Sequence, residues 1–197
     1  MAFSDIASRA LRAAVSCALL TAGCAGAGAP THTPTRDLSP SSLYPLHEGS
    51  AWSYDVDAGD GQTVLATSRV LRIAQGLVEV QSGQGVQRYL LTSEGIKRVS
   101  TEAYLLRSPI AAGSHWPAGP STEARVTAVE QHIETPAGAF EACVVVEEQN
   151  TSSGQEIATT YCPGVGPVRV ESRMEVRGQK LRVVAVLRGF SLEPIGE

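Results

Sequence analysis

The chain has 197 residues, of which 43% are hydrophobic and 18% are charged, and its formal net charge is −4. Beyond any processed leader, this length suits one domain with a real core. The acidic balance argues against nucleic acid as a partner and against polybasic attachment to anionic lipid, because both require an excess of Lys and Arg.

The N-terminal segment resembles the export signal of a bacterial lipoprotein. A basic start precedes a short apolar run, Ala13 to Ala22, which is too short to span a bilayer as a helix. The sequence Leu20-Thr21-Ala22-Gly23-Cys24 then resembles the lipobox at which such precursors are cleaved and lipidated. We expect residues 1–23 to be a signal peptide and Cys24 to carry the lipid. The alternative is an ordinary secretory signal that is cleaved further along, near Ala29.

Residues 24–41 are expected to form a disordered tether, because small residues, Pro and Thr leave nothing to bury. In lipoproteins of bacteria with two membranes, Asp directly after the lipidated Cys favours retention in the inner membrane. Ala25 stands there instead. The resemblance therefore implies a lipid-anchored protein of the cell envelope, in the outer membrane and facing the periplasm.

Residues 42–197 have the pattern of a single all-β domain. Segments rich in Val, Leu, Ile and Thr are separated by Gly, Ser and Asp turns. The connections are short, so neighbouring strands must be mostly antiparallel. We expect an antiparallel meander that forms a curved open sheet, a half-barrel or a sandwich. Segment 100–106 fits one helical turn or an extended strand equally well. The predicted strands are 64–73, 77–81, 86–91, 95–99, 124–133, 139–148, 156–161, 168–176 and 180–187.

A motif occurs twice in this domain. The pattern Pro-[Leu/Ile]-x-x-Gly-Ser-x-Trp ends at Trp52 and again at Trp116, 64 residues later. Residues further along follow in the same order, with Tyr89 corresponding to Tyr161. We interpret this as a tandem duplication with both Trp buried at equivalent places; shared β-sheet composition is the alternative. The proposed halves are residues 44–100 and 108–173.

A disulfide between Cys143 and Cys162 is predicted from hairpin register. An oxidising compartment favours pairing of these two cysteines. The polar tip at 150–154 predicts a hairpin centred between Ser152 and Ser153, in which residues whose numbers sum to 305 face each other, as the two cysteines do. Directly opposed antiparallel residues have Cα atoms about 4.5–5.5 Å apart, which a disulfide can bridge. Two free thiols are the alternative.

Several short motifs of the domain resemble the TapB-like family of uncharacterised bacterial lipoproteins. The resemblance extends over nearly all of the domain, although Pro167 stands where a large apolar residue is usual. No catalytic residue is assigned in that family, so the resemblance implies none here. The matching residues are Tyr44-Pro45-Leu46 with Gly49 and Trp52, Gly113 with Trp116, Thr135-Pro136-Ala137-Gly138-x-Phe140, and Tyr161-Cys162-Pro163-Gly164-Val165-Gly166 with Val168.

The sequence shows no recognisable motif for catalysis or metal binding. The four histidines lack the spacing of metal ligands. The segment Asp55 to Gly61 lacks the closing Glu of an EF-hand and suits a hairpin turn at Asp60-Gly61. The sequence also has no nucleophile elbow, P-loop or dinucleotide fingerprint. We expect no cofactor, no metal and no catalytic residues.

Two classes of function fit these observations. The favoured one is a non-enzymatic binding or scaffold module at the membrane surface, whose partner is an envelope protein or an apolar ligand; a carrier of an apolar ligand or lipoprotein is a variant of it. The other is a cryptic periplasmic hydrolase that uses Asp or Glu. A fold with an apolar hollow would favour the binding module, and a fold with converging carboxylates would favour the hydrolase.

Overall fold

The computed structural model describes residues 31–32, 38–59 and 61–192, so the predicted lipidation site Cys24 lies outside the described residues. The described residues form one sheet and one turn of helix. The elements are β1 (Thr31–His32), α1 (Pro40–Leu43), β2 (Ala51–Asp57), β3 (Thr63–Ala74), β4 (Leu77–Ser82), β5 (Gly85–Leu91), β6 (Gly95–Arg98), β7 (Ala103–Arg107), β8 (His115–Gly119), β9 (Thr122–Thr135), β10 (Gly138–Asn150), β11 (Glu156–Cys162), β12 (Gly166–Val176) and β13 (Gln179–Ser191).

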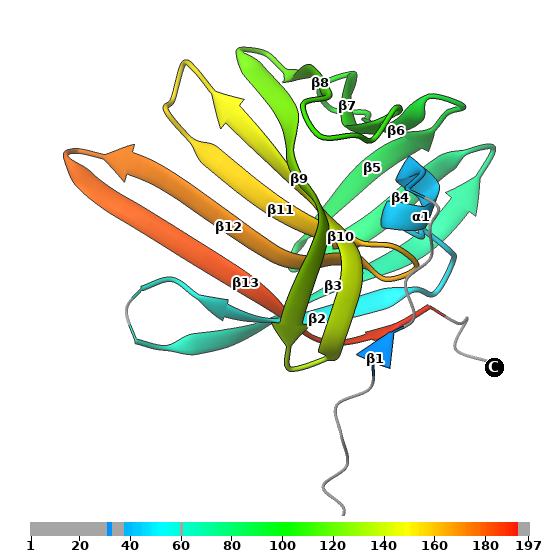
Figure 1. Cartoon of the computed structure of the whole chain (residues 1–197), viewed down its shortest axis with the longest axis horizontal. Coiled ribbons are helices and arrows are strands. Elements are labelled where there is room, and N and C mark those ends of the chain that lie inside the picture. Colours follow the sequence, from blue (N-terminus) through cyan, green and yellow to red (C-terminus); the bar gives the residue numbers. More distant parts are fainter. Residues whose placement is uncertain (1–30, 33–37, 60, 193–197) are drawn as a thin grey trace, which may run out of the picture.

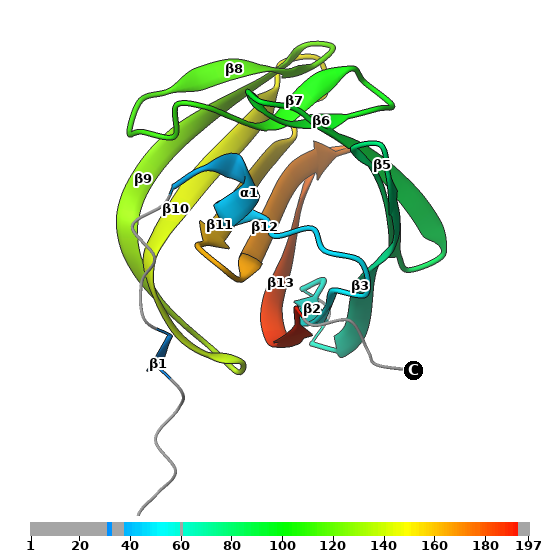
Figure 2. The ribbon, with the colours of Figure 1, turned by 90° about the vertical axis from the view of Figure 1, so that its right-hand side faces the viewer.

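The sheet is antiparallel apart from β1, which pairs in parallel with β10. Its strand order is β7-β6-β5-β4-β3-β2-β13-β12-β11-β10-β9-β8. The sheet curls until its two end strands, β7 and β8, approach each other (Figures 1 and 2). Among the described residues no ladder joins these two strands, so a seam remains there. The expected all-β meander is confirmed, in the form of a nearly closed, barrel-like sheet.

All nine predicted strands are present, with ends within three or four residues of the expected ones. Four further strands were not predicted: β2, β7 and β8, and the two-residue β1 that pairs with β10. The ambiguous segment 100–106 is extended where it forms β7, because its apolar side chains Leu105 and Leu106 are buried in the core. In the part of the chain that the structure describes, no helix has the length and apolar character needed to cross a membrane.

The two motif-bearing segments fold alike. Strands β2–β7 and β8–β13 are consecutive six-stranded meanders, joined where β2 pairs with β13. Gly49 and Gly113 have the same left-handed conformation, with φ of 83° and 85°. Each donates its N–H to the carbonyl of a buried valine, Val70 in one half and Val126 in the other. The tandem duplication remains our interpretation of this likeness.

One end of the barrel-like sheet is closed by α1, which lies inside the ring of strands (Figure 2). Ser39 caps the helical turn by accepting the N–H of Ser42, and Pro40 occupies its first turn, where the missing N–H costs nothing. Leu43 is fully buried, and Ser42 accepts a hydrogen bond from Gly164 before β12. The packed domain therefore begins a few residues before the expected limit of the tether. We call this end the closed end.

The opposite end is open, and we call it the open end. Because successive turns of a meander alternate between the two ends, the turns after β2, β4, β6, β8, β10 and β12 gather here. The β12–β13 hairpin extends furthest. Its ladder with β11 ends at Arg173 and its ladder with β2 ends at Val184, so residues 174–183 project beyond both neighbours (Figure 1, left).

The Cys143–Cys162 disulfide joins β10 to β11, with the two Cα atoms 4.2 Å apart. The adjoining ladder pairs Val144 with Tyr161 and Val145 with Thr160, which is the predicted register. Both cysteines are buried, so the bond is a structural staple in the wall of the sheet and not an exposed thiol site.

Candidate functional site

A strip of apolar side chains follows the concave surface from the core to the open end. On β2, Tyr54 is buried and Val56, two residues later, is partly buried. Val64 of β3, which pairs with Val56, is 63% exposed. Residues two apart in a strand share one face of the sheet, so all three line the interior. Burial thus falls steadily towards the open end.

The neighbouring strand β13 continues the same strip. Leu187 is fully buried, Ala185 is partly buried against the core, and Val183 is 38% exposed. Ala185 pairs directly with Val56, so the two strands form one surface. We define the apolar strip as the residues Val56, Val64, Val183 and Ala185.

Across the interior lies an ion pair between Arg98 of β6 and Glu148 of β10. The Arg98 Nη2 atom lies 2.6 Å from Glu148 Oε1, and Nη1 donates to the carbonyl of Ala118 on β8 at 3.3 Å. The side chains are only 24% and 10% exposed. Burial alone would lower the pKa of Arg98, but its hydrogen bond with Glu148 and the charge of that carboxylate together outweigh burial and raise this pKa.

Two pockets at the open end share Arg98. One, of about 340 Å³, contains both members of the ion pair and the neutral polar residues Thr122, Asn150 and Gln155. The other, of about 530 Å³, is lined in part by Tyr89. Both pockets lie on the polar side of the interior, around Arg98, and the apolar strip on β2, β3 and β13 faces the same interior without lining either pocket. We call this interior surface at the open end the hollow.

Aromatic side chains close the inner limit of this hollow. Tyr44, which follows α1, meets Trp52 edge-on with ring centroids 5.4 Å apart, Tyr89 edge-on at 6.2 Å, and Tyr161 at 6.3 Å. Burial raises the pKa of Tyr44, Tyr89 and Tyr161, so these phenols stay neutral. These rings therefore fill the interior next to α1, and Tyr89 among them also lines the pocket beside Arg98.

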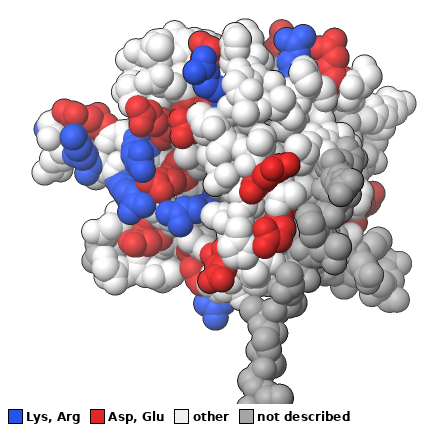
Figure 3. Space-filling model, in the orientation of Figure 1, with Lys and Arg blue, Asp and Glu red and all other residues white. Residues whose placement is uncertain are grey.

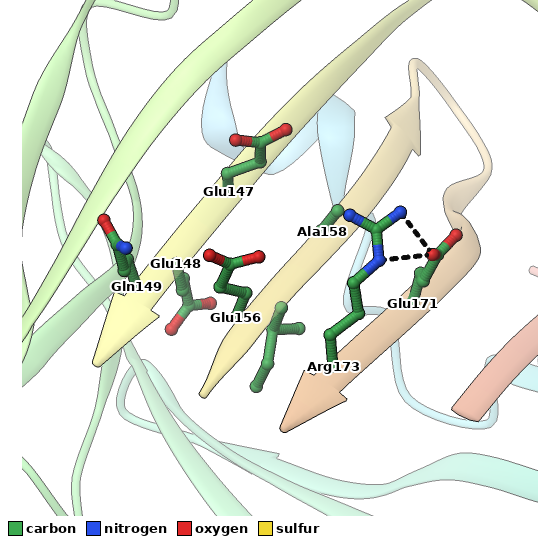
Figure 4. Close-up of a pocket in the computed structure, with 8 residues that line it drawn as sticks. Glu147, Glu148, Gln149, Glu156, Ala158, Glu171 and Arg173 are labelled. Atoms are coloured by element: carbon green, nitrogen blue, oxygen red, sulfur yellow. Dashed lines mark hydrogen bonds and ion pairs between the residues drawn. The ribbon is translucent and has the colours of Figure 1, made fainter. Parts of the chain in front are cut away.

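Carboxylates gather on the outer face instead, around a pocket of about 130 Å³ on β10, β11 and β12 (Figure 4). One member of this group is Glu171, which is 8% exposed and is surrounded by arginines. Arg182 binds both carboxylate oxygens, at 2.7 and 3.0 Å, and Arg169 and Arg173 add further bonds. The bond from Arg182 is the main cause that lowers the pKa of Glu171 to about 2, although burial opposes it. Glu171 is therefore an ionised hub and not a proton donor at neutral pH.

The predicted site residues lie apart from the hollow. Cys24 is outside the described residues, and Cys143 and Cys162 form the wall staple. The ion pair was missed, although the run Val144-x-Val146-x-Glu148 carries a signal: a charged residue falls on the apolar face of a strand. Within the described ranges, no group of three or more His, Cys, Asp or Glu side chains could hold a metal ion.

Comparison with known proteins identifies two solved structures. One is a candidate exported protein with a YMCC-like fold from Bacteroides fragilis, with a TM-score of 0.46 and 14% identity over 75% of this chain and 98% of that one. The other is a candidate lipoprotein from Parabacteroides distasonis, with a TM-score of 0.41 and 17% identity over 76% of this chain and 98% of that one. No family model and no curated protein matches the chain.

Proposed function

We propose that this protein is a lipid-anchored binding module of the bacterial cell envelope, which holds an amphiphilic ligand in the hollow at its open end. The observation that carries the proposal is the apolar strip, whose exposed members Val64 and Val183 face the interior of the sheet. Exposed apolar side chains on a concave surface are typical of ligand sites.

The apolar strip and the ion pair would bind different parts of the ligand. An apolar chain laid along the strip would remove hydrocarbon surface from water, which is favourable by about 25 cal/mol per Å². The polar end of the ligand would meet the Arg98–Glu148 pair, which offers a donor and an acceptor together. No titrating residue is needed for this role.

Binding of a fluorescent fatty-acid analogue by the full chain tests the proposal. Val64→Asp combined with Val183→Asp should weaken binding by about tenfold or more, since each places a charge where hydrocarbon would lie. Leu65→Asp is the matched control: Leu65 is 59% exposed and adjacent to Val64 in sequence, but it points to the convex face. Equal binding by all variants would show that the ligand does not use the strip.

Anchoring is tested separately through Cys24. Radiolabelled palmitate should enter the wild-type protein and not the Cys24→Ser variant, because the thiol is the proposed attachment point. Two or three acyl chains would hold the protein firmly, since each buried CH₂ contributes about 0.8 kcal/mol. Absence of label from the wild type would contradict the anchor while leaving the ligand site untouched. Fractionation of the envelope would then test the proposed placement in the outer membrane.

A further inference from the structure

The projecting part of the β12–β13 hairpin has two unlike faces. Val176 and Leu181, each 44% exposed, lie on the same side as the concave strip. The residues at the alternate positions of the two strands, which include Arg173, Lys180 and Arg182, point to the convex side. The hairpin is therefore amphipathic at the rim of the open end.

Basic residues gather on the convex side even though the protein as a whole is acidic. Between residues 169 and 182 the hairpin carries five basic residues against the two acidic residues Glu171 and Glu175. Four of the basic residues lie on the convex side, and Arg177 lies in the turn at the tip. Asp57 and Glu156, on the neighbouring strands, flank the base of the hairpin. In Figure 3 most of the blue side chains in view lie over this part of the molecule, at the left, with red side chains between them. The overall charge conceals this local excess.

Glu171 organises the basic cluster. Its two oxygens receive bonds from Arg169, Arg173 and Arg182, which fixes three guanidinium groups around one carboxylate. The three groups carry fifteen N–H donors between them by their chemistry, and one carboxylate can accept only about four bonds. Most donors therefore face outward, together with a local net positive charge, and Arg173 and Arg182 are about 60% exposed. Such an arrangement suits the phosphate groups of lipids.

We infer that the β12–β13 hairpin docks the open end onto an anionic phospholipid surface, with Val176 and Leu181 entering the interface and the basic cluster meeting the phosphates. Amphipathic elements with a basic face bind membranes by this combination. The inference goes beyond the proposed function by giving the hollow a place to exchange an amphiphile, but the docking does not depend on what the hollow holds.

The test measures capture of vesicles by the full chain, immobilised through a C-terminal tag. Vesicles of equal parts phosphatidylcholine and phosphatidylglycerol are compared with pure phosphatidylcholine, so that any lipid anchor contributes equally to both. Arg173→Gln/Lys180→Gln/Arg182→Gln should reduce the preference for anionic vesicles by about a hundredfold, because each basic residue contributes about fivefold at an anionic surface. Leu181→Ser should weaken capture as well.

The matched control is Arg72→Gln/Arg88→Gln. These two arginines are equally exposed and share the carboxylate Glu79 on the outer face of β3–β5, away from the hairpin. The control should bind vesicles as the wild type does, and the triple variant should still bind the fluorescent fatty-acid analogue. Unchanged vesicle capture by the triple variant would overturn the inference. So would capture that polyglutamate abolishes while Leu181→Ser has no effect, because the partner would then be an acidic polymer.

Discussion

Trp52 and Trp116 each donate an indole hydrogen bond to a backbone carbonyl in the opposite half of the molecule. Trp52 reaches the carbonyl of Val165, before β12, at 2.7 Å, and Trp116 reaches that of Tyr104, on β7, at 3.1 Å. Both rings are almost completely buried. Each copy of the repeated motif thus supplies one hydrogen bond that joins the two halves. The bond from Trp116 crosses the seam between β7 and β8, where no ladder is formed.

Replacement of either tryptophan by phenylalanine should therefore destabilise the fold beyond the loss of ring volume. Each change leaves a buried carbonyl without its donor, which costs about 1–3 kcal/mol. Urea unfolding gives the free energy, and hydrogen exchange at β7 and β8 should rise in Trp116→Phe but not in Trp52→Phe. Equal exchange in both variants would show that Trp116 does not hold the seam.

Removal of the Cys143–Cys162 disulfide should lower stability by about 3 kcal/mol, because the closed loop between the cysteines is short. The double variant Cys143→Ala/Cys162→Ala, or reduction of the wild type, should give this loss in urea unfolding. Non-reducing mass analysis of the wild type should find neither cysteine open to alkylation. Two alkylatable thiols would contradict both the bond and the observed β10–β11 register.

The Arg98–Glu148 pair should behave as a coupled unit. Arg98→Met alone leaves a poorly solvated carboxylate and should cost about 3 kcal/mol, and Glu148→Leu alone should cost a similar amount. The double variant should be closer to the wild type, because it leaves no uncompensated charge in the hollow. Additive losses in the double-mutant cycle would mean that the two side chains act independently.

Glu171 should make stability depend on pH in the acid range. Its pKa is lowered from 4.5 to about 2 in the folded protein, chiefly by its bond with Arg182. A lowered pKa contributes stability that is present above the ordinary value and is lost as the pH falls towards 2. Urea unfolding between pH 5 and pH 2 should therefore show a steeper decline in the wild type than in Glu171→Gln. Parallel declines in the free energy of unfolding of the two proteins would show that Glu171 does not cause the pH dependence.

Local sequence patterns were enough to predict most of the sheet. Alternation and turn residues located nine strands, and the polar tip at Asn150 fixed the β10–β11 register to the residue. β8 was missed because it is only five residues long and contains Pro117 and Gly119, which weaken a strand pattern. β7 was missed because one turn of helix fits the same few residues.

The site depends on contacts that sequence patterns do not contain. Arg98 and Glu148 are 50 residues apart and meet only because the sheet curls until β6 and β10 face each other across the interior. The basic face of the β12–β13 hairpin was hidden by averaging charge over the chain. Its alternation, Arg169-x-Glu171-x-Arg173, was visible in the sequence, but the convergence of both arginines on Glu171 required the strand geometry.

The pairing of β2 with β13 also sets the order in which the molecule can be made. β2 pairs along one edge with β3, which follows it directly, but its other edge finds a partner only in β13, so this part of the sheet cannot form until β13 has been synthesised. Contacts of such long sequence separation slow folding. Under the proposed export across a membrane, this arrangement would give the precursor time to remain unfolded. Conversely, truncation within β13 would leave β2 as a bare edge strand and expose the nascent protein to aggregation.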